Sequence, residues 1–291
     1  MRYGRRQDSN AGRGFVSTFV TCALATLILM LVAFSQPSLK LRDRYLADYS
    51  GSAVVRQLFD NTAVQVGKIA GINASFAPQS DGNVTSAFYV GLLSSNRSPA
   101  LSSYSSYLQG NFSQAASAVI FPSFGPIASG RVDLMSNTTS FFVDCNANST
   151  GFEPSPGSTS TRFSNVSLSI VVPDSLNSTT EWSYNATGDV YATVSVTSAG
   201  GTTTSSGRLS SSNPQYYMLN VSSGVAVEVY FGNTSAGSGV LRVSSAGVNG
   251  TLNANVTIPY AYSSLWYYNA TLNVTKAAIL RNSRLLVWEG G

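Results

Sequence analysis

The residues of this chain that offer the most chemistry are asparagines. Fifteen of them open an Asn-x-Ser/Thr sequon, the acceptor of N-linked glycans in exported proteins. None precedes Ile72, so the sequons predict that the chain beyond this residue lies outside the cell. The predicted acceptors are Asn73, Asn83, Asn96, Asn111, Asn137, Asn148, Asn165, Asn177, Asn185, Asn220, Asn233, Asn249, Asn255, Asn269 and Asn273.

The middle residues of several sequons predict which face of a strand carries the glycan. In a strand, residues i and i+2 point to the same face, so the asparagine and the Ser or Thr lie together. The residue between them points the other way, and in four sequons it is Val166, Val256, Ala270 or Val274. We therefore expect glycans on the outer face and these apolar residues on the inner face.

Residues for enzyme catalysis are sparse. The chain has no histidine, which excludes Ser-His-Asp and Cys-His nucleophiles and histidine zinc sites. Asp43, Asp48 and Asp60 share a predicted helix with arginines and are expected to form surface ion pairs. We predict no catalytic residue and no cofactor, because the remaining candidates are too scattered to pair as acid and base: Glu153, Glu181, Glu228 and Glu289.

Two groups of residues are of types that could bind a sugar or calcium, but their pattern in the sequence does not establish binding. Aromatic residues could form a platform for sugars, although most such residues in strands serve core or cross-strand packing. Asp81-Gly-Asn83 and Asp144-Cys-Asn146 carry oxygen ligands for calcium but lack the length and carboxylate density of a calcium loop, so we predict no metal site. The aromatic residues are Trp182, Trp266, Trp288, Tyr260, Tyr262, Tyr267 and Tyr268.

The charge pattern excludes a nucleic-acid binder. Charged residues make up 10% of the 291 residues, against roughly 25% in an average soluble domain. The net charge of +4 arises mainly from Arg2, Arg5, Arg6 and Arg13, so no broad basic face is expected. A surface poor in carboxylates changes little on protonation, and we hypothesise that it suits an acidic exterior.

An uncharged apolar run from Phe15 to Phe34 predicts a transmembrane helix over residues 15–36. The basic segment 1–14 before it predicts a cytoplasmic N-terminus, and the sequons support this single-pass orientation. The run could instead be a secretory signal cleaved after Ala33-Phe34-Ser35, although it is longer than the usual apolar region of such signals. An uncleaved anchor is the simplest alternative.

The order of basic residues, Arg13-Gly14 and then an apolar helix opening at Phe15 resembles the class III signal of archaeal type IV pilin-like proteins. The resemblance covers about the first seventy residues. It implies that a prepilin-type peptidase cuts between Gly14 and Phe15 and that the apolar helix is kept for anchoring and assembly. Bacterial pilins have a glutamate where this chain has Phe19, a departure that argues against bacterial-style filament assembly and leaves an archaeal pilin-like or pseudopilin-like role open.

Two further segments follow the membrane span. Helical spacing of apolar residues predicts an amphipathic stalk helix over residues 38–72, which either extends the first helix with a kink at Pro37 or packs on the edge of a β domain. Residues 73–150 have a mixed α/β pattern, with a helix expected near residues 98–118. The stretch 151–161 predicts a loop or linker.

Residues 162–291 predict an antiparallel β-sandwich-like domain, so the fold class is mainly β with N-terminal α. Three segments alternate cleanly: residues 190–197, Val225 to Phe231 and Leu252 to Ile258. A flexible hairpin or an O-glycosylated patch is expected at residues 198–212.

Together these patterns predict a membrane-tethered, N-glycosylated structural protein of the cell surface, serving in a pilin-like filament, an adhesin or the envelope. The expected partners are the lipid bilayer, like subunits or other pilin-like proteins, and surface glycans, with no nucleic acid. The alternative is a β-sandwich module on a membrane stalk that binds carbohydrate or a protein partner.

Overall fold

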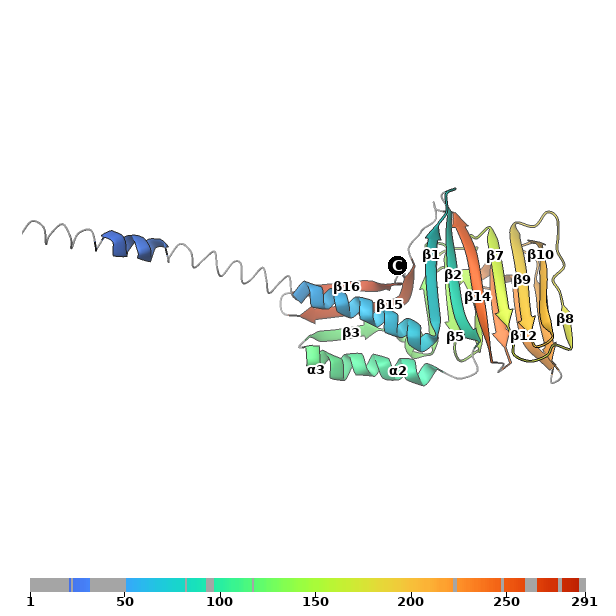
Figure 1. The fold of residues 1–291 in the computed structure, drawn as a ribbon, viewed down its shortest axis with the longest axis horizontal. Coiled ribbons are helices and arrows are strands. Elements are labelled where there is room, and N and C mark those ends of the chain that lie inside the picture. The colour runs from blue at the N-terminus through green and yellow to red at the C-terminus, as the bar shows by residue number, and fades with distance from the viewer. Residues whose placement is uncertain are drawn as a thin grey trace, which may run out of the picture. The chain divides into compact units, whose positions relative to one another are not determined.

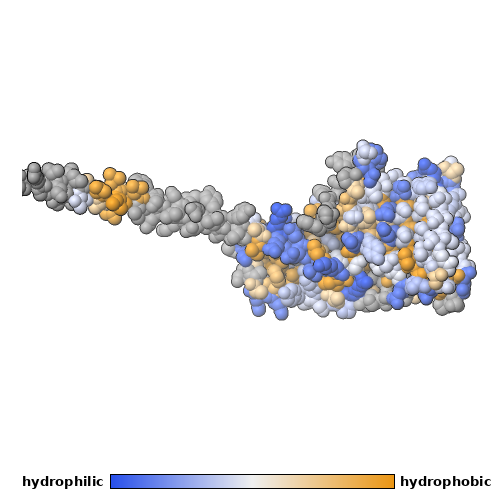
Figure 2. All heavy atoms as spheres, viewed as in Figure 1, coloured by the Kyte–Doolittle hydropathy of each residue, from blue (hydrophilic) through white to orange (hydrophobic). Residues whose placement is uncertain are grey.

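The structure is a computed structural model that describes residues 21, 23–31, 51–81, 83–92, 97–116, 118–221, 224–246, 249–259, 266–276 and 279–287. The chain divides into two compact units, residues 1–53 and residues 54–291 (Figure 1). In the first unit the described residues are helical, and the side chains of Leu24, Leu27 and Leu31 are exposed, as the apolar surface in Figure 2 shows.

The predicted processing residues Gly14 and Phe15, the leader 1–14 and most of the predicted span 15–36 lie outside the described residues. Within the described part of the chain, no helix combines the length and the apolar character needed to span a membrane.

The second unit is built around two β-sheets. In order across the six-stranded sheet lie β1 (Ile72–Pro78), β2 (Asn83–Leu92), β14 (Gly250–Pro259), β7 (Asn165–Val171), β9 (Val190–Ser198) and β10 (Gly201–Leu209). All its pairs are antiparallel except β7 with β9. Their apolar residues alternate with polar ones, as in β9, where Val190, Ala192, Val194 and Val196 are all buried.

The ten-stranded sheet supplies the second layer. In order across it lie β16 (Ile279–Leu286), β15 (Tyr267–Lys276), β4 (Arg131–Met135), β5 (Thr139–Asp144), β6 (Ser149–Pro154), β13 (Gly237–Ser245), β12 (Gly224–Thr234), β11 (Gln215–Val221) and β8 (Ser178–Thr180). The tenth strand, β3 (Val119–Ser123), pairs with β15 beside β4.

Apolar residues of both sheets meet in one core, so the prediction of a mainly β, sandwich-like fold is confirmed. Phe88 of β2 stacks on Phe141 of β5 with ring centroids 4.3 Å apart, and Trp266 meets Phe88 edge to face. Segments 73–150 and 162–291 share both sheets, because β2 pairs with β14 and β4 pairs with β15. They therefore fold as one unit.

Within this unit, helical residues 54–70 pack against the sheets and lie beside β15 and β16 (Figure 1). Gly71 follows the helix at φ +72°, and Arg97 donates a hydrogen bond of 2.8 Å to the carbonyl of Ala70 in its last turn. The residues that the helix buries follow three-to-four spacing: Val55, Leu58, Phe59, Ala63, Val66 and Ala70. The part of the predicted stalk before residue 51 lies outside the described residues.

The helix expected near residues 98–118 is present in three consecutive pieces: α2 (Ser98–Tyr107), the π-helical turn η1 (Leu108–Phe112) and α3 (Ser113–Ala116). Leu101 and Leu108 lie on the inner face of this helical segment and are buried. A short helix, α4 (Gly125–Ala128), precedes β4. Residues 198–212, where a flexible hairpin or an O-glycosylated patch is expected from the sequence, form the turn after β9 and then strand β10, so the hairpin of β9 and β10 begins earlier, at Val190.

Two sequence predictions about strands need correction. Val225 is 44% exposed, because a bulge opposite Leu219 and Asn220 shifts the register of β12 and turns Ala226 into the core instead. The predicted loop 151–161 begins inside β6, and only its later residues connect the two sheets.

Candidate glycosylated surface

The sequons are distributed over both sheets, the turns and the helical segment, and many present their asparagine to solvent. On β7, Asn165 is exposed and Ser167 lies on the same face, while Val166 between them is buried. This is the arrangement that the alternation predicts. The exposed acceptors are Asn73, Asn111, Asn137, Asn165, Asn177, Asn185, Asn233 and Asn249.

Six further acceptors are partly buried: Asn83, Asn148, Asn220, Asn255, Asn269 and Asn273. Hydrogen bonds hold the amide nitrogen in three of these cases. Nδ2 of Asn83 donates to Asp81 over 2.7 Å, and Nδ2 of Asn220 donates to Oγ of Ser178 over 3.1 Å. Nδ2 of Asn269 donates to Asp133 over 2.6 Å. Asn96 lies outside the described residues.

Asn269 is part of a polar network that the sequence did not reveal. Its Oδ1 accepts a hydrogen bond of 3.2 Å from the backbone N–H of Asp133, so both ends of its amide are in use. Arg131 forms ion pairs with Asp133 at 2.9 Å and with Glu153 at 2.7 Å, and Arg242 reaches Glu153 at 3.1 Å. Side chains of four strands, β4, β6, β13 and β15, are thus linked on the outer face of the ten-stranded sheet.

Burial and charge oppose each other in this network. Burial raises the pKa of Asp133, although the guanidinium of Arg131 acts in the opposite direction. Burial also acts to lower the pKa of Arg131, but the carboxylates of Asp133 and Glu153 raise it overall. The guanidinium of Arg131 lies 4.7 Å from the ring centroid of Phe142, so the network covers an aromatic side chain. The only sequence signal was the alternation Arg131-Val-Asp133, which places the two charges on one face.

For the main aromatic candidates the structure confirms core packing, the expected role, and does not support a platform for sugars. Trp182 and Trp266 are 4% and 1% exposed and belong to the core, together with Tyr268. Trp182 packs edge to face on Tyr217, with ring centroids 5.7 Å apart. Tyr267 is partly buried on β15, and Trp288, Tyr260 and Tyr262 lie outside the described residues.

The two candidate calcium segments form turns. Asp81 accepts hydrogen bonds from the backbone N–H and the side chain of Asn83, which lower its pKa. Oδ1 of Asp144 accepts from the backbone N–H groups of Asn146 and Ala147. Among the described residues, no three His, Cys, Asp or Glu side chains gather as a metal site would require.

The remaining acidic candidates are dispersed. Asp60 pairs with Arg56 at 3.9 Å on the helix surface, as its spacing predicted, while Asp43 and Asp48 lie outside the described residues. Glu181 accepts a hydrogen bond from Ser205, and Glu228 is half-buried on β12. Glu289 also lies outside the described residues.

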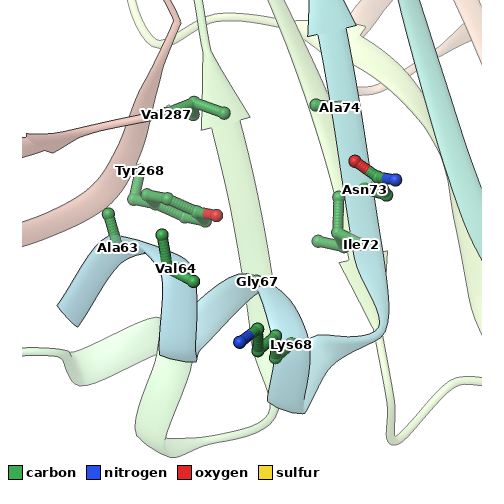
Figure 3. Close-up of a pocket in the computed structure, with 9 residues that line it drawn as sticks. All are labelled: Ala63, Val64, Gly67, Lys68, Ile72, Asn73, Ala74, Tyr268 and Val287. Atoms are coloured by element: carbon green, nitrogen blue, oxygen red, sulfur yellow. The ribbon is translucent and has the colours of Figure 1, made fainter. Parts of the chain in front are cut away.

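A cavity of about 360 Å³ lies between helical residues 54–70, β1 and β15 (Figure 3). Ala63, Val64 and Ile72 give it a mainly apolar wall, and the phenol of Tyr268 points into it. Burial raises the pKa of Tyr268. Lys68 and Asn73 complete its lining, so the polar groups at this cavity are one amine, one amide and the Tyr268 phenol, with no carboxylate among the lining residues.

Comparison with known proteins finds no matching family model, no matching curated protein and no matching solved structure. The site therefore rests on its own geometry, which is a set of outward-facing acceptor asparagines on a rigid two-sheet scaffold.

Proposed function

We propose that this chain is a membrane-tethered, N-glycosylated structural protein of the cell surface, with its N-terminus in the cytoplasm and the second unit, residues 54–291, outside. We call this second unit the β unit. The observation that carries the proposal is the placement of the acceptors. Eight sequon asparagines are exposed, on both sheets, in turns and in the helical segment, while apolar neighbours such as Val166 are directed into one core. A glycan coat on such a unit would shield its edges from proteases and from pairing with other sheets.

The proposal includes a pilin-like role, in which the chain contributes to a filament, an adhesin or the envelope. Its support is the Arg13-Gly14-Phe15 sequence together with a helix whose residues 54–70 pack on the β unit. In this arrangement the apolar segment 15–36 serves as anchor and assembly surface, and the β unit is presented outside.

Mass spectrometry of the protein isolated from its own membrane tests both parts. We expect a mature N-terminus at Phe15 and glycopeptides that contain Asn165 or Asn185. A mature chain that begins at Met1 or Arg2 would replace pilin-type processing with a simple anchor, and one that begins at Gln36 would indicate a released protein. Absence of glycan from all exposed acceptors would overturn the glycoprotein proposal.

The alternative, a stalk-presented module that binds sugars, is less well supported. The two tryptophans that would have formed its platform are buried in the core and are not accessible to a ligand. Retention of the purified β unit on a glycan array would revive it.

A further inference from the structure

The outer face of the three strands β3, β15 and β16, which lie side by side in Figure 1, exposes large apolar side chains among polar ones. Val119 and Phe121 of β3 are 51% and 63% exposed, and Leu280 of β16 is 69% exposed. The opposite face of the same strands is buried in the core through Ile120, Leu272 and Val274. Val119, Phe121 and Leu280 therefore form an apolar outer face, and none of the described residues covers it.

Two sequons lie on this outer face. Asn269, Thr271, Asn273 and Thr275 are alternate residues of β15 and so point to the same side. The register places Asn273 between Phe121 on one side and Asn282 on the other. It also places Thr275 between Val119 and Leu280. The sequon Asn273-Val-Thr275 thus lies in the middle of the apolar outer face.

The two asparagines differ in whether their amide nitrogen is available. Asn269 uses both ends of its amide with Asp133. Asn273 is partly exposed, and its Oδ1 is buried without a hydrogen-bond partner. This leaves Nδ2, the atom that carries an N-linked glycan, as the end of the Asn273 amide on the solvent side.

A groove continues from Phe121 toward the helical segment. It has a volume of about 340 Å³ and is lined by Gln109, Ser113 and Gln114 on one side and by residues 118–121 on the other. Neutral amides and a hydroxyl beside an aromatic ring are the groups that suit a sugar, whose polar edges need hydrogen bonds and whose C–H faces pack on apolar surface.

We propose that Asn273 carries an N-linked glycan whose first sugars lie across Phe121 and cover the apolar outer face, whereas Asn269 is never glycosylated in the folded protein. This inference rests on the proposed function, because it requires that the β unit meet a glycosylation machinery. The chain's own glycan takes the place that a second copy or another partner would otherwise occupy on this face.

The experiment uses the full-length chain produced in its own host. Glycopeptides that span β15 are analysed after enzymatic release of glycans in heavy-isotope water, which marks each asparagine that carried one. We expect a mark at Asn273 and none at Asn269. Thr275→Ala, which removes the Asn273 sequon, should lower the mass by one glycan, and the matched control Thr271→Ala, which removes the Asn269 sequon, should leave the mass unchanged.

A second measurement tests the cover itself. The Thr275→Ala protein should bind an apolar fluorescent dye several-fold more strongly than the wild type, and adding Phe121→Ser should reverse most of this increase. Unchanged dye binding in Thr275→Ala would show that the glycan does not lie on this face and would overturn the proposal.

The outcomes also separate this inference from the proposed function. Occupied acceptors elsewhere, such as Asn165, with an unmodified Asn273 would refute the inference alone. Unmodified acceptors throughout would refute both. Self-association of the wild-type β unit through Val119 and Phe121, with Asn273 unmodified, would assign the face to a second copy and likewise overturn the proposal.

Discussion

At the scale of single residues, the hydroxyl of Tyr217 is a polar group buried in the core. This side chain is fully buried on β11, and its hydroxyl has no hydrogen-bond partner among the described residues. A buried hydroxyl without a partner costs about 1–3 kcal/mol of stability. Burial, with smaller contributions from Glu181 and Tyr184, raises the pKa of Tyr217 to about 12.

We predict that Tyr217→Phe stabilises the β unit by about 1 kcal/mol, because it removes the unpaired hydroxyl and keeps the ring. The gain should grow at alkaline pH. Between the ordinary pKa of 10.0 and the folded pKa of about 12, the phenol of Tyr217 ionises more readily in the unfolded chain than in the folded one. The free energy of unfolding of the wild type therefore falls as the pH rises through this range, and below it there is no such loss. Urea unfolding at neutral pH and at about pH 11 measures both effects. Tyr216→Phe, on the same strand but 45% exposed, is the control and should change little.

The candidate site shows which residue properties the sequence can predict. Alternation along β7 predicted that Asn165 points outward, because that depends only on neighbours in the sequence. It could not predict the state of Asn269, whose partner Asp133 is 136 residues away. The aromatic residues show the same limit of sequence-based prediction. Trp182 and Trp266 are residue types that also occur in sugar-binding platforms, and only the tertiary fold shows that both are buried.

At the scale of elements, the contact between helical residues 54–70 and β15 depends on a glycine. A Cβ added at Gly67 would lie 2.8 Å from the hydroxyl of Tyr268, the group that points into the cavity in Figure 3. Glycine inside a helix costs about 1 kcal/mol relative to alanine. Close packing of the helix on β15 therefore offsets an intrinsic weakness of the helix.

We predict that Gly67→Ala gains little by itself, because the clash with Tyr268 cancels the gain in helix propensity. In a Tyr268→Phe background the clash is absent, and Gly67→Ala should then stabilise the protein by about 1 kcal/mol. A double-mutant cycle measured by thermal and urea unfolding gives the coupling. Gly110→Ala, with no atom within 4 Å of the added Cβ, is the matched control and should not depend on residue 268. Additive effects of the Gly67 and Tyr268 changes would contradict the prediction.

The strands show the same division between local and distant causes. The period of two predicted the buried faces of β9 and β14, because each residue's side follows from its place in the strand. It was wrong at Val225, where the pairing of β12 with β11 creates a bulge that moves Ala226 inward. The order of strands in the two sheets also depends on distant pairing and could not be predicted.

At the scale of the whole molecule, the sparse charge leads us to expect only a small change of stability in acid. Hydrogen bonds from Asn83 lower the pKa of Asp81, so its contribution is present above its ordinary pKa of 3.8 and is lost only as the pH falls through the lower, folded value. Burial raises the pKa of Asp133, so its contribution has the opposite sign and grows as the pH falls. The two effects do not reinforce each other.

We predict that the melting temperature of the β unit changes little between pH 7 and about pH 4. We compare the melting temperature of the wild type with that of Asp133→Asn. As the pH falls from 7 to about 4, the wild type should gain on the variant, because only the wild type has the buried carboxyl of Asp133 to protonate. Differential scanning calorimetry at several pH values measures both quantities. A sharp loss of stability in the wild type before pH 4 would refute the prediction and the acid-exterior hypothesis with it.

The pairing of β2 with β14 has a consequence for how the protein is made. Val90 pairs with Leu252, and β3 pairs with β15 near the other end of the unit, so neither sheet can close until the last strands have arrived. Such long sequence separations slow folding, because the entropy of closing a long loop is lost before the contacts form. In the exported arrangement that we propose, most of the chain would cross the membrane before β2 gains β14 as its second partner, although β1 and β2 can already pair with each other. During that interval we expect the abundant Ser, Thr and Asn, rather than charge, to keep the open edge of β2 from aggregating.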